Sequence, residues 1–152
     1  MPADVAVEHL SADAYTIPTD APETDGTASW TSTTIVVVHA QAGGQCGLGY
    51  SYTDAGAARL IAGKLAAAAV GHDALDPPAS ARALQAAVRN IGREGGAAAA
   101  ISAVDIALWD LKARLLDIPL AGLLGRCRDR VAIYGSGGFT SYDEQALAHQ
   151  LS

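Results

Sequence analysis

The chain has 152 residues, of which half are hydrophobic and 17% are charged, and this composition is typical of one globular domain with a sizeable core. Its formal net charge is −6, and residues 1–58 hold seven acidic side chains and no Lys or Arg. An acidic surface of this kind argues against non-specific nucleic-acid binding, which needs clustered basic residues.

Targeting and membrane segments are not visible in the sequence. Its N-terminus lacks the basic and apolar stretches of a signal peptide, and no apolar run reaches the ~18 residues that span a bilayer. The two cysteines, Cys46 and Cys127, lie far apart and lack the spacing of a metal site or a disulfide framework. We therefore expect a cytoplasmic protein whose partners include neither membranes nor nucleic acids.

The first third of the chain predicts a small antiparallel sheet. Residues 4–17 alternate irregularly between apolar and polar side chains and predict a first strand, which a proline ends. Residues 18–30 are rich in Pro, Asp, Ser and Thr and predict a loop. The β-branched residues within 33–42 predict a second strand, and the Gly pair 43–44 predicts a hairpin turn into a third strand over 45–52.

Three helices are predicted after the sheet. The first begins after Thr53 or Asp54, either of which can accept a hydrogen bond from the first turn, and ends near Val70. The second covers residues 76–91 and starts with an Asp-Pro cap, and the third covers 97–118 and stops before a proline. Apolar residues at steps of three or four mark the buried faces of the three helices: Leu60, Ile61 and Leu65; Leu84, Val88 and Ile91; Ile101, Val104, Leu108, Leu111 and Leu115.

A new structural unit is predicted to begin near residue 126. After a linker with three arginines, residues 131–134 form an apolar run that predicts a strand. Ser141 and Glu144 fit a capping box, and leucines follow at helical spacing. Three strands, three helices and then a strand with a helix predict an α+β fold followed by the start of an alternating β/α domain.

The helical segment AISAVDIALWDLK at residues 100–112 carries a resemblance to a known family. Together with Ile-Pro-Leu at 118–120, Leu-Leu-Gly at 123–125 and VAIYGSGG at 131–138, it resembles the enolase superfamily, in the branch of mandelate racemase and the muconate-lactonising enzymes. The resemblance implies a capping domain made of a three-stranded antiparallel meander and a helical bundle. A (β/α)7β barrel, a variant of the TIM barrel, would follow it.

The resemblance also implies domain limits and a chemistry. Residues 1–125 would form the capping domain, and residues 126–152 the first strand and part of the first helix of a truncated barrel. In the family, three carboxylates hold Mg²⁺, the metal binds the substrate carboxylate, and a Lys or His base removes the neighbouring proton to give an enediolate. These groups are expected after residue 152, so we expect no catalytic residue, no metal ligand and no activity in this chain alone.

The partners implied by the resemblance are a small carboxylate substrate, either a hydroxy acid or a sugar acid, the missing barrel domain, and further copies of the full-length protein in a homo-oligomer. By position, residues 18–30 and 48–53 correspond to two loops that close over the substrate. Trp30, Tyr50 and Tyr52 are therefore candidate substrate contacts. A Glu is common in the family where Tyr50 stands, which leaves the substrate open.

The Gly-rich segment around Ser136 has two interpretations. It follows a predicted strand and precedes a predicted helix, so its N–H groups could face an anion, and Ser136 joins the candidate contacts. A plain β/α loop explains the same residues. The Gly-rich segment at 43–49 lacks the Lys-Ser/Thr of a phosphate-binding loop and is better explained as a turn.

The remaining polar residues favour structural roles. Asp105 and Asp110 lie about 140° apart around their helix, so an acid/base pair is not expected. We expect a buried structural hydrogen bond for Asp105 and a surface or interface one for Asp110. Trp109 is expected to pack, the four His do not cluster, and Cys46 is expected to be inert.

Two function classes follow from the sequence, and a third is weaker. The first is the N-terminal part of a Mg²⁺-dependent acid-sugar dehydratase or racemase. The second is a non-catalytic module that caps a partner or oligomerises, and the third is a nucleotide binder. In each case we expect residues 131–152 to be poorly protected from hydrogen exchange, because the predicted strand has no neighbours to pair with.

Overall fold

The computed structural model describes residues 5–135 and 137–152. These residues form two compact units, and each is described by itself. The core unit contains the residues up to Tyr15 together with 34–126. The hairpin unit contains 16–33 together with 127–152.

Three strands form one sheet in the order β1-β2-β3. Their bounds are His9–Thr24 for β1, Ser29–Ala42 for β2 and Gln45–Tyr52 for β3. Strands β2 and β3 pair antiparallel, and the register runs from Ile35 opposite Tyr52 to Ala42 opposite Gln45. The predicted meander is confirmed, and its second turn is the Gly pair, whose φ angles of 55° and 74° favour glycine.

The predicted loop over residues 18–30 is wrong. Strand β1 continues through Pro18 to Thr24, and β2 begins at Ser29, so only four residues form the turn between them. Because β1 is an edge strand of the sheet, a proline can face away from the neighbouring strand without removing a ladder hydrogen bond. The threonines of this segment then favour a strand.

The helical region contains the three predicted helices, with one irregularity. The helices and helical turns are α1 (Gly56–Leu60), the π-helical η1 (Ile61–Leu65), α2 (Ala66–Ala69), α3 (Pro77–Ala87), α4 (Gly96–Leu115), α5 (Leu120–Leu123) and α6 (Glu144–Gln150). The first three form one continuous predicted helix. Ala55 is its N-cap residue, and Asp54 Oδ1, just before it, accepts a hydrogen bond from Gly56 N at 2.7 Å. Asp76 caps α3 by accepting from Ala79 N at 3.1 Å.

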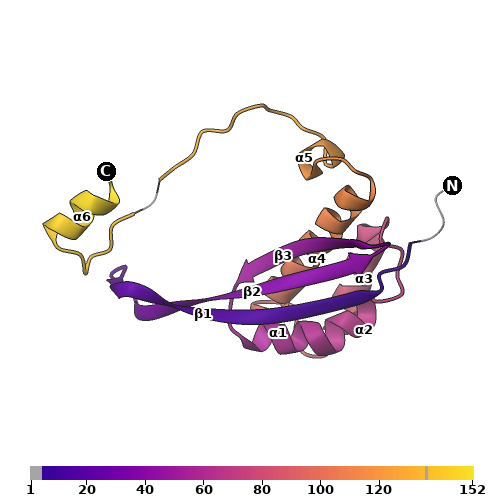
Figure 1. Cartoon of the computed structure of the whole chain (residues 1–152). Helices are drawn as coiled ribbons and strands as arrows, with labels where there is room; N and C mark the ends of the chain where they lie inside the picture. The colour runs from indigo at the N-terminus through magenta and orange to yellow at the C-terminus, as the bar shows by residue number, and fades with distance from the viewer. Residues whose placement is uncertain (1–4, 136) are drawn as a thin grey trace. The chain divides into compact units, whose positions relative to one another are not determined.

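The predicted buried faces of the helices are confirmed except at the end of α3. The helix stops at Ala87 and continues as turns, so Ile91 lies outside it and is 56% exposed. Leu84 and Val88 are fully buried. The four helices α1 to α4 lie together on one side of the sheet (Figure 1), and they cover the alternate residues Val36, Val38, Ala40 and Ala42 of β2.

Strand β3 packs against α4 through two buried glycines. A Cβ at Gly47 would lie 2.7 Å from Leu111 Cβ and closer still to backbone atoms of α4. A Cβ at Gly49 would clash with Ala103 O and lie 2.6 Å from Ala107 N. Only residues without a side chain allow this approach of strand to helix, so these glycines set the sheet–helix distance.

The predicted strand at 131–134 is wrong. These residues form no strand, and Ile133 and Tyr134 are 93% and 91% exposed. No other strand of the described residues pairs with them, so their backbone groups gain nothing from strand geometry. The capping box is also wrong, because Asp143 caps α6 by accepting from Ala146 N at 2.8 Å.

Candidate functional site

The tip of the β1–β2 hairpin is a tight turn organised by Asp25. Its Oδ1 accepts hydrogen bonds from Thr27 N at 2.8 Å, from Thr27 Oγ1 at 2.6 Å and from Ala28 N at 3.0 Å. These bonds favour the ionised carboxylate and lower the pKa of Asp25. Gly26 supplies the φ of 91° that the turn requires. The hairpin therefore ends in a defined turn rather than a loop.

Trp30 is fixed beside this turn by two neighbours. Its Nε1 donates to Glu23 Oε2 at 2.6 Å, across the turn. Its ring meets Phe139 edge-to-face, with 5.5 Å between centroids and 86° between planes. Phe139 in turn meets Tyr142 in the same manner at 5.4 Å. The candidate contact Trp30 is thus one member of an aromatic cluster.

Residues 140 and 141 fasten the second segment of the hairpin unit to the hairpin. Thr140 donates twice to Thr24 O, from its backbone N at 2.9 Å and from Oγ1 at 2.8 Å. Ser141 Oγ donates to Pro22 O at 2.7 Å, so this hydroxyl bonds the hairpin rather than its own helix. Three hydrogen bonds and one ring contact therefore join segments more than 100 residues apart.

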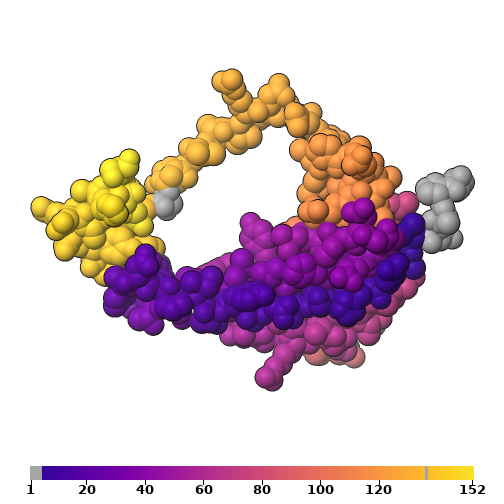
Figure 2. All heavy atoms as spheres, in the orientation of Figure 1, coloured from indigo at the N-terminus to yellow at the C-terminus, as the bar shows by residue number. Residues whose placement is uncertain are grey.

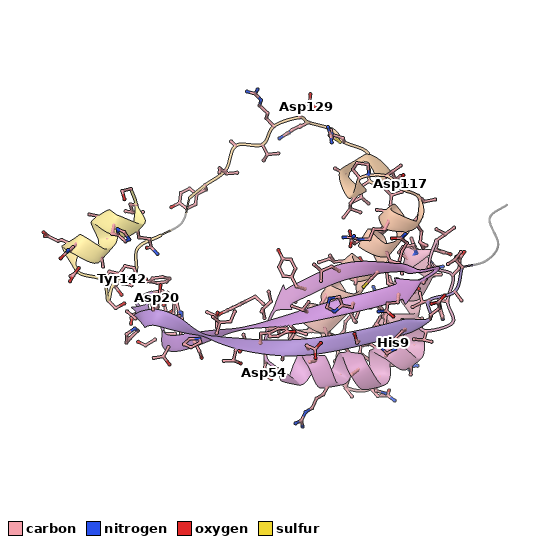
Figure 3. The ribbon with its side chains drawn as sticks, viewed as in Figure 1. His9, Asp20, Asp54, Asp117, Asp129 and Tyr142 are labelled. Atoms are coloured by element: carbon pink, nitrogen blue, oxygen red, sulfur yellow. The ribbon has the colours of Figure 1, made fainter. Side chains whose placement is uncertain are left out.

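A pocket of 490 Å³ opens beside α6 within the hairpin unit. Asp20, Tyr142, Ala146 and His149 are among the residues that line it, and Figure 3 labels Asp20 and Tyr142 there. Asp143 also lines the pocket but already caps α6. Within residues 5–135 and 137–152, no three His, Cys, Asp or Glu side chains gather as a metal site would require.

Tyr50 and Tyr52 lie on the open face of the sheet in the core unit. They alternate along β3 with the glycines that face α4, so both rings point away from the helices, and they are 59% and 73% exposed. Their partners across the ladder are Val37 and Ile35. Figure 2 shows atoms of the strands, coloured indigo to purple, at the visible surface of the molecule. Both tyrosines are free to contact another group.

Ser136 lies outside the described residues. Of its neighbours, Gly138 donates its N–H to Gln150 Oε1 at 2.6 Å. This donor is therefore engaged within the chain and is not available to an anion. The role of Ser136 itself stays a prediction.

The polar and aromatic side chains of the long helix α4 differ in their contacts. Asp110 Oδ2 accepts from Leu48 N at 2.8 Å and from Arg114 Nε at 2.7 Å, which confirms a surface hydrogen bond. The buried hydrogen bond expected for Asp105 is wrong, since it has no partner among the described residues. Partial burial instead raises the pKa of Asp105. Trp109 packs under the Lys112 ammonium, 5.2 Å from the ring centroid.

Three features of the site were missed from the sequence. Glu23 and Phe139 hold Trp30, and Gly47 and Gly49 were attributed to turn chemistry although they lie inside a strand. The pattern Gly-x-Gly within alternating residues could have signalled close backbone approach on one strand face. No sequence signal identifies Phe139 as a neighbour of Trp30.

Comparison with known proteins shows which family the chain matches. The family model described as "Mandelate racemase / muconate lactonizing enzyme, N-terminal domain" matches residues 13–125. The chain belongs to this family. The resemblance drawn from residues 100–112 and the predicted α+β fold are therefore confirmed.

Solved structures of the mandelate racemase/muconate lactonizing enzyme family agree with the fold. A mandelate racemase/muconate lactonizing enzyme-like protein from Rubrobacter xylanophilus is 57% identical, with a TM-score of 0.92 over 96% of this chain and 41% of that one. L-talarate/galactarate dehydratase from Salmonella typhimurium, solved with Mg and L-lyxarohydroxamate, is 30% identical, with a TM-score of 0.72 over 84% of this chain and 35% of that one.

A curated relative carries out a different reaction. The 3,6-anhydro-alpha-L-galactonate cycloisomerase of Streptomyces coelicolor is 35% identical over 137 residues, which are 86% of this chain and 38% of that protein. The chain thus spans about two fifths or less of the length of these three relatives. The relatives include dehydratases and isomerases, and their structures include Mg-bound ones. No helix in the described part of the chain is long and apolar enough to cross a bilayer.

Proposed function

We propose that this chain is the N-terminal part of a Mg²⁺-dependent acid-sugar dehydratase or racemase that removes the proton next to a substrate carboxylate. The family match over residues 13–125 carries the proposal. In it, residues 1–125 are the capping domain and 126–152 begin the barrel. The family match ends at residue 125, and the core unit ends at Arg126, which supports this boundary.

The described residues do not gather a carboxylate set suited to Mg²⁺. From the family resemblance, and not from that absence, we place the metal ligands and the base in residues outside this chain, and we assign no step of the reaction to residues present here. The role left for this chain is to cover the substrate and select it. We assign this role to Trp30, Tyr50, Tyr52 and Ser136, and we place the enzyme in the cytoplasm as a homo-oligomer.

The exposure of the tyrosine rings and the fixed position of Trp30 support this assignment. Aromatic rings offer a large contact area at a small entropic cost, so they suit selection of a sugar-acid carbon skeleton. Other aromatic residues on the same sheet serve as controls. Tyr15, which is 51% exposed on β1, has no proposed contact with substrate.

The test uses the full-length protein with Mg²⁺ and a panel of hydroxy acids and sugar acids that includes L-talarate and galactarate. NMR in D2O detects exchange of the α-proton, which dehydration and racemisation both require. We expect exchange with at least one acid, and no exchange by the 152-residue chain alone. Turnover by the short chain, or no exchange by the full-length protein with any acid, would end the proposal.

Variants then test the contacts. We expect Tyr50→Ala and Tyr52→Ala to lower kcat/KM by about tenfold or more, which is typical of losing one apolar contact, while Tyr15→Ala leaves it unchanged. A loss of activity that is equal in all three variants would point to stability rather than substrate contact. If exchange is absent and sedimentation shows the chain itself assembling, the non-catalytic capping or oligomerising module takes the place of the enzyme.

A further inference from the structure

The indole of Trp30 has already used its only hydrogen-bond donor. Nε1 donates to Glu23 Oε2 at 2.6 Å, a short bond strengthened by the acceptor's charge. An indole N–H can make only one such bond well. The part of Trp30 that remains for a ligand is its apolar ring.

The ring itself is held from a second direction. Phe139 meets it edge-to-face at 5.5 Å, and Tyr142 supports Phe139 at 5.4 Å. Thr140 and Ser141, which follow Phe139, bond the hairpin at Thr24 O and Pro22 O, the two neighbours of Glu23 in the chain. All these residues belong to the hairpin unit, so the geometry lies within one compact body.

From these contacts we infer that Glu23 and Phe139 are positioning residues that fix the Trp30 ring so that it selects substrate by shape and not by donating a hydrogen bond. The inference rests on the proposed function, since it takes Trp30 as a substrate contact. In this inference the enzyme prefers an acid that presents C–H groups, rather than a hydroxyl or carboxylate, to the Trp30 ring. Glu23 is assigned no contact with substrate here; its role in this inference is to position the ring through the bond from Nε1 to Oε2.

The first test measures the ring and needs no activity. Trp30 and Trp109 are the two tryptophans, so the 152-residue chain with Trp109→Phe reports on Trp30 alone. We expect Glu23→Ala and Phe139→Leu to raise acrylamide quenching of Trp30 roughly twofold or more, because an unheld side chain samples several rotamers within nanoseconds. Glu23→Gln should restore the original quenching, since its amide oxygen still accepts the bond.

Asp13→Ala is the matched control for this test. Asp13 is an exposed carboxylate on the same strand, so the variant removes a negative charge without touching the indole. Far-UV circular dichroism and thermal midpoints show whether each variant is folded. If acrylamide quenching of Trp30 is equal in Glu23→Ala and Asp13→Ala, the inference is overturned, and this outcome does not depend on the activity of the full-length protein.

The second test measures substrate selection in the full-length protein. We expect Trp30→Phe to retain most of kcat/KM and Trp30→Ala to lose about tenfold or more, since only the ring matters. Equal losses in the two variants would mean that the N–H is used by substrate, and would overturn the inference. If Trp30→Ala leaves kcat/KM unchanged while Glu23→Ala still frees the ring, the assigned contact of Trp30 fails but Glu23 remains its positioning residue.

Discussion

The core unit packs α4 against β3 and α3 against α4 through buried apolar faces, whereas the described residues of the hairpin unit include no fully buried side chain. The hairpin unit instead relies on three hydrogen bonds to the hairpin and two ring contacts. Burial of a large side chain contributes about 1.5–3 kcal/mol, and a net hydrogen bond about 1 kcal/mol. One chain therefore combines a region built for stability with a region that opens at low cost.

Hydrogen exchange gives the largest expected contrast between the two units. Amides of β2 opposite β3 should exchange only by global unfolding, with protection factors of about 10³ or more. Amides of residues 131–135 should exchange at nearly the unprotected rate, because these residues form no strand or helix. Mass spectrometry of peptides from both regions measures the difference. Equal protection in both would remove the contrast.

Gly49→Ala tests whether the core unit depends on close approach of β3 to α4. The new Cβ would meet backbone atoms of the helix, which cannot move aside as a side chain can. We expect a loss above about 3 kcal/mol, beyond usual overpacking, or an unfolded chain. Gly63→Ala is the control, because it lies exposed in η1 with open space at its Cβ. Urea unfolding should show that variant unchanged or slightly more stable.

Leu108→Ala and Leu147→Ala compare the same truncation in the two units. Leu108 is 1% exposed in α4, and its removal leaves a cavity that should cost about 3 kcal/mol. Leu147 is 38% exposed in α6, and its truncation should change the free energy of unfolding by less than about 1 kcal/mol. Denaturant midpoints measure both. A large effect at Leu147 would reveal burial in the hairpin unit beyond that described.

Asp105 offers the smallest effect and a test of sign. The pKa of Asp105 is raised above 3.8, the ordinary value that applies in the unfolded chain. Just above pH 3.8 the folded state therefore keeps a proton that the unfolded chain has lost. Stability from this group therefore falls as pH rises through that interval and stays lower above it. Asp105→Asn should be slightly more stable at pH 7, by less than about 1 kcal/mol, and equal at lower pH. Glu94→Gln, an exposed control, should change the free energy of unfolding at pH 7 by no more than about 0.5 kcal/mol.

Local signals explain most of what the sequence predicted correctly. Three local signals each act within a few residues of where they stand: the Gly pair between β2 and β3, the side-chain hydrogen bonds of Asp54 and Asp76 at helix starts, and the periodic leucines of α4. They need no knowledge of the rest of the fold. The helix motif at 100–112 then identified the family.

The errors come from properties that depend on distant residues. Pro18 interrupts a strand only if its missing N–H faces a neighbouring strand, and β1 is an edge. Residues 131–134 have strong β propensity, but a strand needs a partner that the described residues do not supply. At the candidate site, the position of Trp30 in the sequence is enough to predict it as a contact. The role of Glu23 depends on the strand register across the turn, and that of Phe139 depends on a contact between residues more than 100 positions apart.

The two glycines of β3 have a consequence for synthesis of the protein on the ribosome. Their face of the strand is completed only when α4 has emerged, some 60 residues after β3 ends. At about 5–20 amino acids per second, the nascent sheet waits several seconds with an apolar side uncovered. Chaperones that shield nascent chains would meet this protein during that interval.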